Sequence, residues 1–420
     1  MNKSFSSAIV MIRFFITACF ILLCFQGCIK DKITHTYTIL TPVYKTKEQV
    51  QTNIKSNPPK PIQFPGKIFI YGQYIFLNEV DKGVHIIDNS NPDNPIAKAF
   101  IDIPGNLDIA VKANTLYADM YGDLVAVDII DPLNVKLMKD IPNIFPERSY
   151  GNGLIADKTR VIVDWIRQDT TVEVQPAGNF IVLNYSNNGS GLLTGPSANK
   201  TASGVAGSMA RFSIVNDYLY AVDHHTLKSI SISNGNDPKL IATTNAGWDI
   251  ETIYPFKDKL FLGSMGGMFI FDISNPASPV SVSQFVHARA CDPVVADDNY
   301  AYVTLRAGTS CGPTNNELQV IDIKNLASPS LLKTYSMTNP HGLSKDGNTI
   351  FICDGSGGLK IYNASDVSNL QLIKQITGIE TYDVIAFNGN ALVVTMDGLY
   401  QYDYSNLSNI HLRSKIIIAK

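Results

Sequence analysis

One short pattern recurs eight times along this chain of 420 residues. It consists of an apolar stretch with an aromatic residue, a turn rich in Gly and Asp, and a second apolar stretch that ends in Asp, often followed by Ser-Asn-Pro. The clearest copies are YIFLNEVDKGVHIIDNSNPDNP, TLYADMYGDLVAVDIIDP, KLFLGSMGGMFIFDISNPASP and TIFICDGSGGLKIYNAS. Because short β-branched and aromatic stretches between turn signals are typical of strands, the pattern predicts a repeated β unit.

The Asp that ends the second apolar stretch measures the spacing of the units. It occurs at Asp88, Asp128, Asp272, Asp322 and Asp403, and its place is taken by Asn184, Ser231 and Asn363 in the degenerate copies. A period of about 40 residues is typical of a four-stranded propeller blade, and sheets of this kind bury both faces when they pack radially. We therefore predict an all-β propeller of four-stranded antiparallel blades. Eight blades are expected; seven is the alternative, if the degenerate third and fourth units share one blade.

The second unit illustrates the four expected strands. They are LDIAVKA (A), TLYADM (B), DLVAVDI (C) and VKLMKDI (D). The Asp at the end of strand C is expected to accept hydrogen bonds from backbone N–H groups of the following turn. We also hypothesise that THTYTIL (35–41) adds a strand to the last blade and closes the ring.

The N-terminus has the features of an export signal. Lys3 and Arg13 precede an apolar run at residues 14–25, which is too short to span a bilayer. The run ends in Gln-Gly-Cys28, which resembles a bacterial lipoprotein signal with Cys28 acylated after cleavage of residues 1–27. Cys19, a plain secretory signal and an uncleaved anchor remain as alternatives. We expect a protein that is exported and lipid-anchored in the bacterial cell envelope, on the periplasmic or surface face of the outer membrane.

The mature chain then divides into a tether and one domain. Residues 28–65 are expected to be a tether with one short helix, KEQVQTNIK, and residues 66–420 form the propeller. The net charge of −3 becomes −5 when Lys3 and Arg13 leave with the signal, and no basic stripe is present. A nucleic-acid partner is therefore not expected, and we predict a monomer bound to the membrane through its lipid.

Propeller topology assigns loops to faces. The B–C loops and the D–A connections share one face of the ring. Two insertions, at residues 167–178 and 306–316, are both expected to be B–C loops. Cys291 is expected to start strand A of the sixth unit and Cys311 lies in its long B–C loop, so we predict a disulfide between them, with two free thiols as the alternative. A bond closing a loop of about 20 residues would contribute about 3 kcal/mol.

The starts of the A strands should surround the central axis on the same face. A strand that only fills a core should begin with apolar or small residues, whereas most of these starts are ionisable. Aligning the A strands gives Asp108, Gly153, Arg211, Glu251, Asp292, His341 and Asp383, with Arg289 and Arg306 nearby. Such a ring of charges is expected to have shifted pKa values.

Three interpretations of this ring remain open. The first is structural: the acids accept loop N–H groups and connect the blades. The second is a ligand site formed by Asp108, Arg211, Glu251, Arg289, Asp292, Arg306, His341 and Asp383. Its Arg residues could bind a carboxylate or phosphate, and Trp165 or Trp248 could form an apolar wall. The third is metal binding or catalysis, with Asp292, His341 and Asp383 as acid and base groups. No pair of residues has the spacing of metal ligands, and no cofactor is predicted.

The copies KLFLGSMGGMFIFDISNPASPV and TIFICDGSGGLKIYNAS resemble the LVIVD repeat, and with its signal the chain is similar to LVIVD-repeat lipoproteins of the Bacteroidota. The resemblance implies an exported β-propeller and no agreed activity. We predict a binding or scaffold module that contacts a partner protein or glycan through its B–C loop face. The alternative is a hydrolase or lyase acting on an anionic substrate at the central mouth.

Overall fold

The computed structural model describes residues 33–146, 159–174, 205–208, 210–287, 293–308 and 315–418. The chain divides into two compact units, one formed by Met1–Val43 with Asp164–Tyr185 and the other by Tyr44–Val163 with Ser186–Lys420. The predicted signal at residues 1–27 and the predicted lipid site Cys28 lie outside the described residues. Within the described ranges, no helix has the length and hydropathy that crossing a membrane would require.

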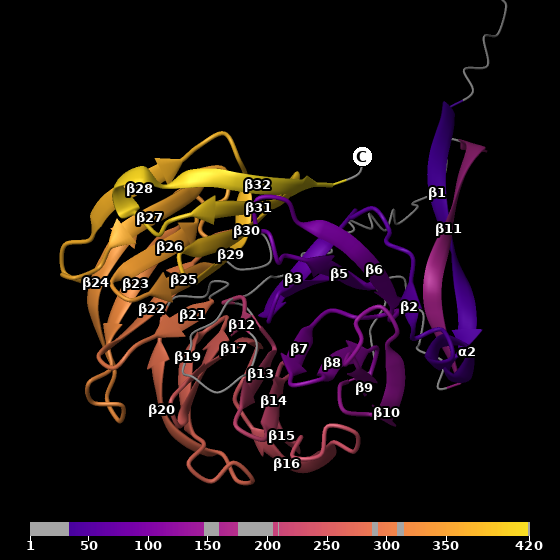
Figure 1. Ribbon diagram of the computed structural model, residues 1–420, viewed down its shortest axis with the longest axis horizontal. Coiled ribbons are helices and arrows are strands. Elements are labelled where there is room, and N and C mark those ends of the chain that lie inside the picture. The colour runs from indigo at the N-terminus through magenta and orange to yellow at the C-terminus, as the bar shows by residue number, and fades with distance from the viewer. Residues whose placement is uncertain are drawn as a thin grey trace, which may run out of the picture. The chain divides into compact units, whose positions relative to one another are not determined.

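The larger unit is a propeller whose described residues form seven blades, each a four-stranded antiparallel sheet with its strands in chain order (Figure 1). Blades 1 to 3 comprise β3 (Pro65–Tyr71), β4 (Tyr74–Glu79), β5 (Gly83–Asp88) and β6 (Ile96–Asp102); β7 (Ile109–Lys112), β8 (Thr115–Met120), β9 (Asp123–Asp128) and β10 (Lys136–Ile141); and β13 (Phe212–Val215), β14 (Tyr218–Val222), β15 (Thr226–Ser231) and β16 (Lys239–Asn245).

Blades 4 to 7 repeat the same order. They comprise β17 (Ile250–Phe256), β18 (Lys259–Ser264), β19 (Gly267–Asp272) and β20 (Val280–Val286); β21 (Val294–Ala296), β22 (Tyr300–Leu305), β23 (Glu317–Asp322) and β24 (Ser330–Ser336); β25 (Leu343–Asp346), β26 (Thr349–Cys353), β27 (Leu359–Asn363) and β28 (Gln371–Ile376); and β29 (Thr381–Phe387), β30 (Asn390–Thr395), β31 (Gly398–Asp403) and β32 (His411–Ile417).

The expectation of eight blades is wrong, and the alternative of seven is confirmed. The described strand of the third unit, β11 (Arg160–Val174), pairs with β1 (Ile33–Thr46) in a separate two-stranded sheet, and the fourth unit forms blade 3 by itself. The same pairing corrects two other expectations. The segment THTYTIL lies in β1 and does not join the last blade, and residues 167–174 belong to β11 rather than to a B–C loop of a blade.

The ring closes without strand exchange, because all four strands of blade 7 come from the C-terminal end of the chain. Side chains connect blade 7 to blade 1 instead. The amides of Asn89 and Gln401 exchange two hydrogen bonds, at 3.1 and 2.7 Å, and Arg413 Nε lies 2.7 Å from Asp93 Oδ1. A buried apolar cluster that includes Ile68 of β3 and Ile385 of β29 fills the space between these two blades.

The Asp at the end of strand C acts as predicted. Asp272 Oδ1 accepts hydrogen bonds from the backbone N–H and the hydroxyl of Ser274, and Asp88, Asp128, Asp322 and Asp403 each accept from the N–H two residues on. The C–D turn of every blade is also contacted by the preceding blade. The donor and acceptor pairs are Ser56 and Pro132, Lys139 and Asp237, Ser229 and Pro276, Ser283 and Leu326, Tyr335 and Val367, Lys374 and Ile410, and Ser414 and Pro92.

Three short elements add to blade 1 or precede it. Helix α2 (Lys47–Gln51) lies within the segment KEQVQTNIK and begins with a capping box, in which Thr46 and Gln49 satisfy each other's backbone N–H groups. Strand β2 (Ser56–Asn57) pairs with the outer strand β6. Strand β12 (Val205–Ala206) pairs with β3, the innermost strand, so it lies on the axial side of the blade.

Candidate functional site

The A strands of successive blades pack beside one another around the centre of the ring (Figure 1). Their starts lie on the face that also carries the B–C loops and the D–A connections; we call it the mouth face. The blades can be aligned on the strand A residue that pairs with the fourth residue of strand B. In four blades a charged residue comes directly before that position, namely Lys67, Asp108, Arg211 and Asp383. Glu251 and His341 lie one residue earlier in their blades. We call these six residues, together with Asp119 and Arg306, the mouth cluster.

Two acids of blade 2 hold the start of blade 3. Asp108 Oδ2 accepts the backbone N–H of Arg211 at 2.5 Å, and Asp119 Oδ2 lies 3.2 Å from the Arg211 guanidinium. Asp119 Oδ1 also accepts the N–H groups of Leu107 and Asp108 and the amide of Asn106. These contacts support the structural interpretation for this part of the ring, since both carboxylates are buried and satisfied by neighbouring backbone.

Lys67 and Asp383 are buried at the junction of blades 1 and 7. Burial lowers the pKa of Lys67 to about 8, although the charges of Asp108 and Asp383 act in the opposite direction. Asp383 lies directly against Gly342, where an added Cβ would meet its Oδ1 at 2.1 Å. Only a glycine at position 342, in the neighbouring blade, leaves room for this carboxylate.

Glu251, Arg306 and His341 form the more open side of the mouth cluster. Burial raises the pKa of Glu251 to about 7, and the charge of Asp249 adds to this while Arg306 opposes it. Burial, followed by the nearby Arg306, lowers the pKa of His341 to about 3, so its imidazole is neutral at neutral pH. The His341 ring packs edge-on against Tyr382, with 5.2 Å between the centroids. A cation, a carboxyl group that titrates near neutrality and a neutral imidazole thus come together here.

The chain's own residues 205–208 enter the centre of the ring. Val205 and Ala206 pair with Ile70 and Phe69 of β3, and Ser208 Oγ accepts the backbone N–H of Leu343 at 2.7 Å. Ser208 is fully buried. This segment therefore connects the inner strand of blade 1 with the inner strand of blade 6 on the axial side of the ring.

Trp165, which the sequence suggested as an apolar wall, and several polar residues do not belong to the mouth cluster. Trp165 lies in β11, and His224 and His225 lie in the B–C turn of blade 3 rather than in a strand. Asp354 accepts the N–H groups of Thr338 and Asn339 and stabilises a turn. The remaining predicted positions, Gly153, Arg289, Cys291, Asp292 and Cys311, lie outside the described residues. The cysteine that the structure does describe, Cys353, is a free and buried thiol.

Sequence reasoning missed Lys67, Asp119 and Ser208. Lys67 could have been found by aligning GKIFIY of the first unit with the other A strands. The other two depend on contacts between distant segments, for which the sequence carries no local signal. In the part of the chain that the structure describes, no group of three or more His, Cys, Asp or Glu side chains is arranged to hold a metal ion.

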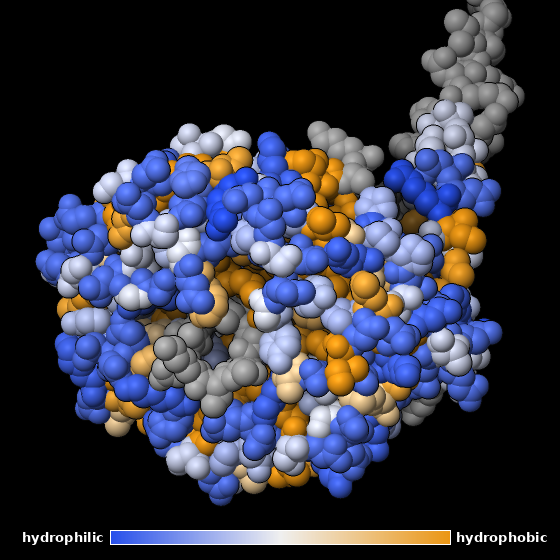
Figure 2. All heavy atoms as spheres, viewed as in Figure 1, coloured by the Kyte–Doolittle hydropathy of each residue, from blue (hydrophilic) through white to orange (hydrophobic). Residues whose placement is uncertain are grey.

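The mouth face also exposes large apolar side chains. Trp248 is 77% exposed in the D–A connection between blades 3 and 4, and its ring contacts His225 at 5.0 Å. Phe64, Val286 and Met396 are each about two-thirds exposed, at 68, 68 and 66%, at the same end of their blades. On the face drawn in Figure 2, hydrophilic residues predominate and hydrophobic ones form separate patches.

The comparisons with known proteins agree with this architecture. The LVIVD repeat model matches residues 66–102, 261–286 and 288–337. The chain therefore contains LVIVD repeats. A comparison with curated proteins found no match. Similar solved structures include a protein from Lactobacillus plantarum, with 12% identity and a TM-score of 0.54 over 85% of this chain and 97% of that one.

Two further solved structures show the same fold. The periplasmic gluconolactonase of Pseudomonas aeruginosa has 9% identity and a TM-score of 0.52, covering 84% of this chain and 96% of its own. Sqt1 of Saccharomyces cerevisiae has 8% identity and a TM-score of 0.50, covering 87% and 90%. At these identities the likeness of the LVIVD-repeat protein to its neighbours shows the fold alone.

Proposed function

We propose that this LVIVD-repeat propeller is an exported, lipid-anchored binding module that contacts a partner protein through its mouth face. The observation that carries the proposal is the exposure of Trp248, Phe64, Val286 and Met396 on one face of a rigid ring. Aromatic residues and Met are enriched at protein interfaces, and Phe64, Trp248 and Met396 are residues of these types. A rigid scaffold that presents variable loops is also well suited to binding.

The arrangement of the mouth cluster favours binding over catalysis. Asp108 and Asp119 are occupied by backbone N–H groups, and residues 205–208 lie on the axial side of the ring. Charged groups around an apolar surface orient a partner and increase the association rate. A partner would therefore meet exposed apolar side chains together with the more open charges of Glu251 and Arg306.

The test compares the two faces of the ring. The chain would be crosslinked in intact host cells and purified with its crosslinked partner, which mass spectrometry identifies. A Trp248→Ser, Met396→Ser double variant should lose that partner. The matched control is Ile130→Ser with Leu133→Ser, which removes side chains that are 72 and 52% exposed in the C–D turn of blade 2, on the opposite face.

If both double variants keep the same crosslinked protein, the mouth face is not the binding surface. A product that glycosidases remove and proteases do not would replace the protein partner with a glycan, which is the other ligand class that the sequence allows.

A second candidate is an enzyme acting on an anionic substrate at the mouth, and one observation favours it. Glu251 titrates near pH 7 beside the Arg306 guanidinium, so a general acid or base and an anion-binding group are close together. His341 is neutral and Asp383 is fully buried, so Glu251 fits the acid–base role better than either of them. Glu251→Gln should abolish turnover of a uronic-acid polysaccharide by folded protein; substrate turnover that is unchanged in the variant would exclude this mechanism.

A further inference from the structure

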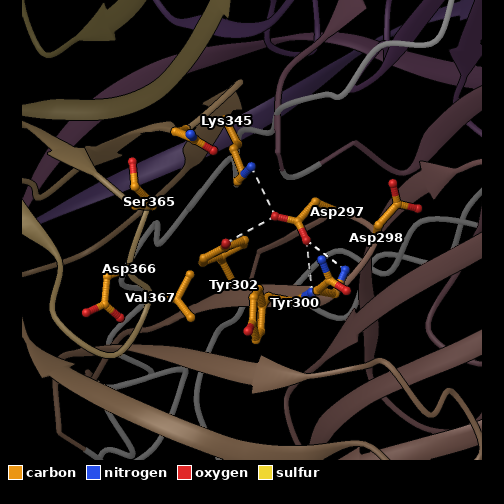
Figure 3. A pocket seen from close by; sticks show the side chains of 11 residues that line it. Asp297, Asp298, Tyr300, Tyr302, Lys345, Ser365, Asp366 and Val367 are labelled. Carbon is orange, nitrogen blue, oxygen red and sulfur yellow. Dashed lines mark hydrogen bonds and ion pairs between the residues drawn. The ribbon is translucent and has the colours of Figure 1, made fainter.

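A polar groove lies on the opposite face of the ring, at the junction of blades 5 and 6. Its volume is about 440 Å³. Figure 3 shows that the A–B turn of blade 5, with Asp297, Asp298 and Tyr300, forms one wall, and that Ser365 and Asp366 lie on the other. Lys345 of β25 contributes its ammonium group between the two walls. This volume lies within the usual range of about 300 to 1,000 Å³ for small-molecule sites.

The repeat itself shows that this junction is unusual. In six blades strand A extends up to the two-residue A–B turn, but in blade 5 β21 ends at Ala296, one residue before the turn formed by Asp298 and Asn299. The side chain of Asp297 bonds to this turn instead: its Oδ1 accepts the N–H groups of Asn299 and Tyr300, each at 2.9 Å.

The second departure faces the first across the junction. Lys345 pairs with the second residue of strand B in blade 6. In the other six blades the residue at this position is apolar, namely Ile70, Val111, Ile214, Pro255, Ala296 and Ala386. Lys345 Nζ lies 3.0 Å from Asp297 Oδ2, which also accepts the hydroxyl of Tyr302 at 3.1 Å. Two changes to the repeat, one in each blade, are therefore paired with each other, as expected of a built site.

The contacts within the groove restrict the class of ligand. Asp297 accepts four donors, which is close to the capacity of a carboxylate, so it fixes the floor and has little left for a ligand. The charges on two sides of the groove are already paired within the protein, Lys345 with Asp297 and Lys257 with Asp298. An ion of either sign would therefore have to compete with an existing ion pair at these positions.

The remaining groups suit an uncharged ligand with many hydroxyl groups. Exposed amides of Asn299 and Asn348 offer donors and acceptors, and the exposed carboxylate of Asp366 offers acceptors. The partly exposed ring of Tyr300 offers an apolar surface. Lys324 lies over this ring at 4.7 Å from its centroid and donates to its hydroxyl at 3.2 Å, which holds the ring in place. We propose that the groove between blades 5 and 6 binds a neutral saccharide. The groove lies on the face opposite to the one proposed for the partner protein, so the two proposals are independent.

The repeat also supplies a matched control for the test. Asn348 and Asn114 occupy the same place in the A–B turns of blades 6 and 2, where each carbonyl accepts the N–H that follows strand C. Both side chains are exposed. Asn348→Trp would fill the groove, whereas Asn114→Trp places the same ring at an equivalent turn elsewhere. Ser365→Tyr fills the groove from its other wall, and it is the test variant if Asn348→Trp fails to fold.

Binding of maltose, cellobiose and N,N′-diacetylchitobiose to the chain without its signal would be measured by saturation-transfer NMR and calorimetry. We expect at least one of these disaccharides to bind, with a dissociation constant of about 1 mM or below. Binding should weaken at least about tenfold in Asn348→Trp and in Ser365→Tyr and stay unchanged in Asn114→Trp.

Three results would overturn the proposal. No disaccharide of the panel binds; binding is unaffected when the groove is filled; or inorganic phosphate or calcium ions bind to the groove in place of the sugars. The last result would show that the ligand is charged.

Discussion

Asn89 in blade 1 and Gln401 in blade 7 exchange two amide hydrogen bonds across the junction at which the ring closes, although 312 residues separate them in the sequence. Gln401 also accepts the amide of Asn390, and its side chain is buried. Because blade 7 takes no strand from the N-terminal part of the chain, such side-chain pairs replace the hydrogen-bonded strand that could otherwise close a ring.

Removal of this pair should destabilise the closed ring. Gln401→Ala removes a buried amide and leaves the partly buried amides of Asn89 and Asn390 without this partner, so the free energy of unfolding should fall by about 1 to 3 kcal/mol. Urea unfolding of Asn89→Ala, Gln401→Ala and the double variant would form a double-mutant cycle. We expect an interaction energy of at least about 0.5 kcal/mol between the two residues; strictly additive effects would show that the pair does not stabilise the closure.

A second prediction concerns Gly358, the residue immediately before strand C of blade 6. Gly358 has a φ of +78°, and a Cβ at this position would lie 2.0 Å from the carbonyl oxygen of Ile376 in strand D. Gly347 also has a positive φ, +55°, but nothing lies within 4 Å of its missing Cβ. Substitution by Ala at either position should lower the free energy of unfolding by about 1 to 2 kcal/mol, because the backbone there is left-handed. Only Gly358→Ala should also displace strand D.

The difference between the two glycine variants isolates this steric contact. Thermal or urea unfolding should show Gly358→Ala to be less stable than Gly347→Ala by at least about 1 kcal/mol. Equal losses of stability would mean that strand D moves without cost, and that the Gly of the repeat is needed only for its backbone angles.

The repeat pattern was enough to predict the propeller, the four strands of seven of the units and the turn built on the final Asp of strand C. Those features depend on residues close together in the sequence. The number of blades depends on the pairing partner of a strand, which local patterns do not encode. Residues 161–165, VIVDW, have the pattern of a blade strand, yet they lie in β11, which pairs with β1.

The same distinction holds for the candidate sites. The position of a charge at the start of an A strand could be predicted, because strand register follows from the repeat. The groove beside Asp297 and Lys345 could not be recognised, because its two signals, an Asp next to the A–B turn and a Lys among apolar residues, acquire meaning only when blades 5 and 6 are seen to meet. Contacts made by Ser208 on the axial side of the ring have no sequence signal.

A third prediction follows from Glu251. Its pKa is raised from 4.5 to about 7, chiefly by burial, so the folded state binds a proton that the unfolded state releases at lower pH. The wild-type protein therefore loses stability from this group as pH rises from about 4.5 to about 7. Glu251→Gln lacks this titration, so its stability relative to the wild type should increase over the same interval.

Urea midpoints measured across this pH range would test the Glu251 prediction. Glu48→Gln, which removes an exposed carboxylate in α2, provides the comparison for a charge outside the mouth cluster. A stability difference between wild type and Glu251→Gln that stays constant with pH would show that Glu251 titrates as it does in the unfolded chain.

The cysteine pair Cys291 and Cys311 gives a fourth prediction. The chain from residue 29 onward contains three cysteines, these two and Cys353. Because Cys353 is fully buried, it should react with a thiol reagent only after unfolding. We expect unfolded, non-reduced protein to show one reactive thiol; three reactive thiols would contradict the disulfide. Reduction should then lower the free energy of unfolding by about 3 kcal/mol.

The last prediction tests the membrane anchor. Cys28 follows the apolar run at residues 14–25, and Cys19 lies within that run, so the two cysteines are competing acylation sites. Acylation attaches long hydrocarbon chains, which hold a protein on a membrane when more than one chain is present. In the native host, Cys28→Ala should move the protein from the detergent phase to the aqueous phase and remove the lipid mass from its N-terminal peptide. Cys19→Ala should leave both properties unchanged, because that residue would leave with the signal. The opposite pattern would place the anchor at Cys19, and a protein that stays in the aqueous phase even as wild type would carry no lipid.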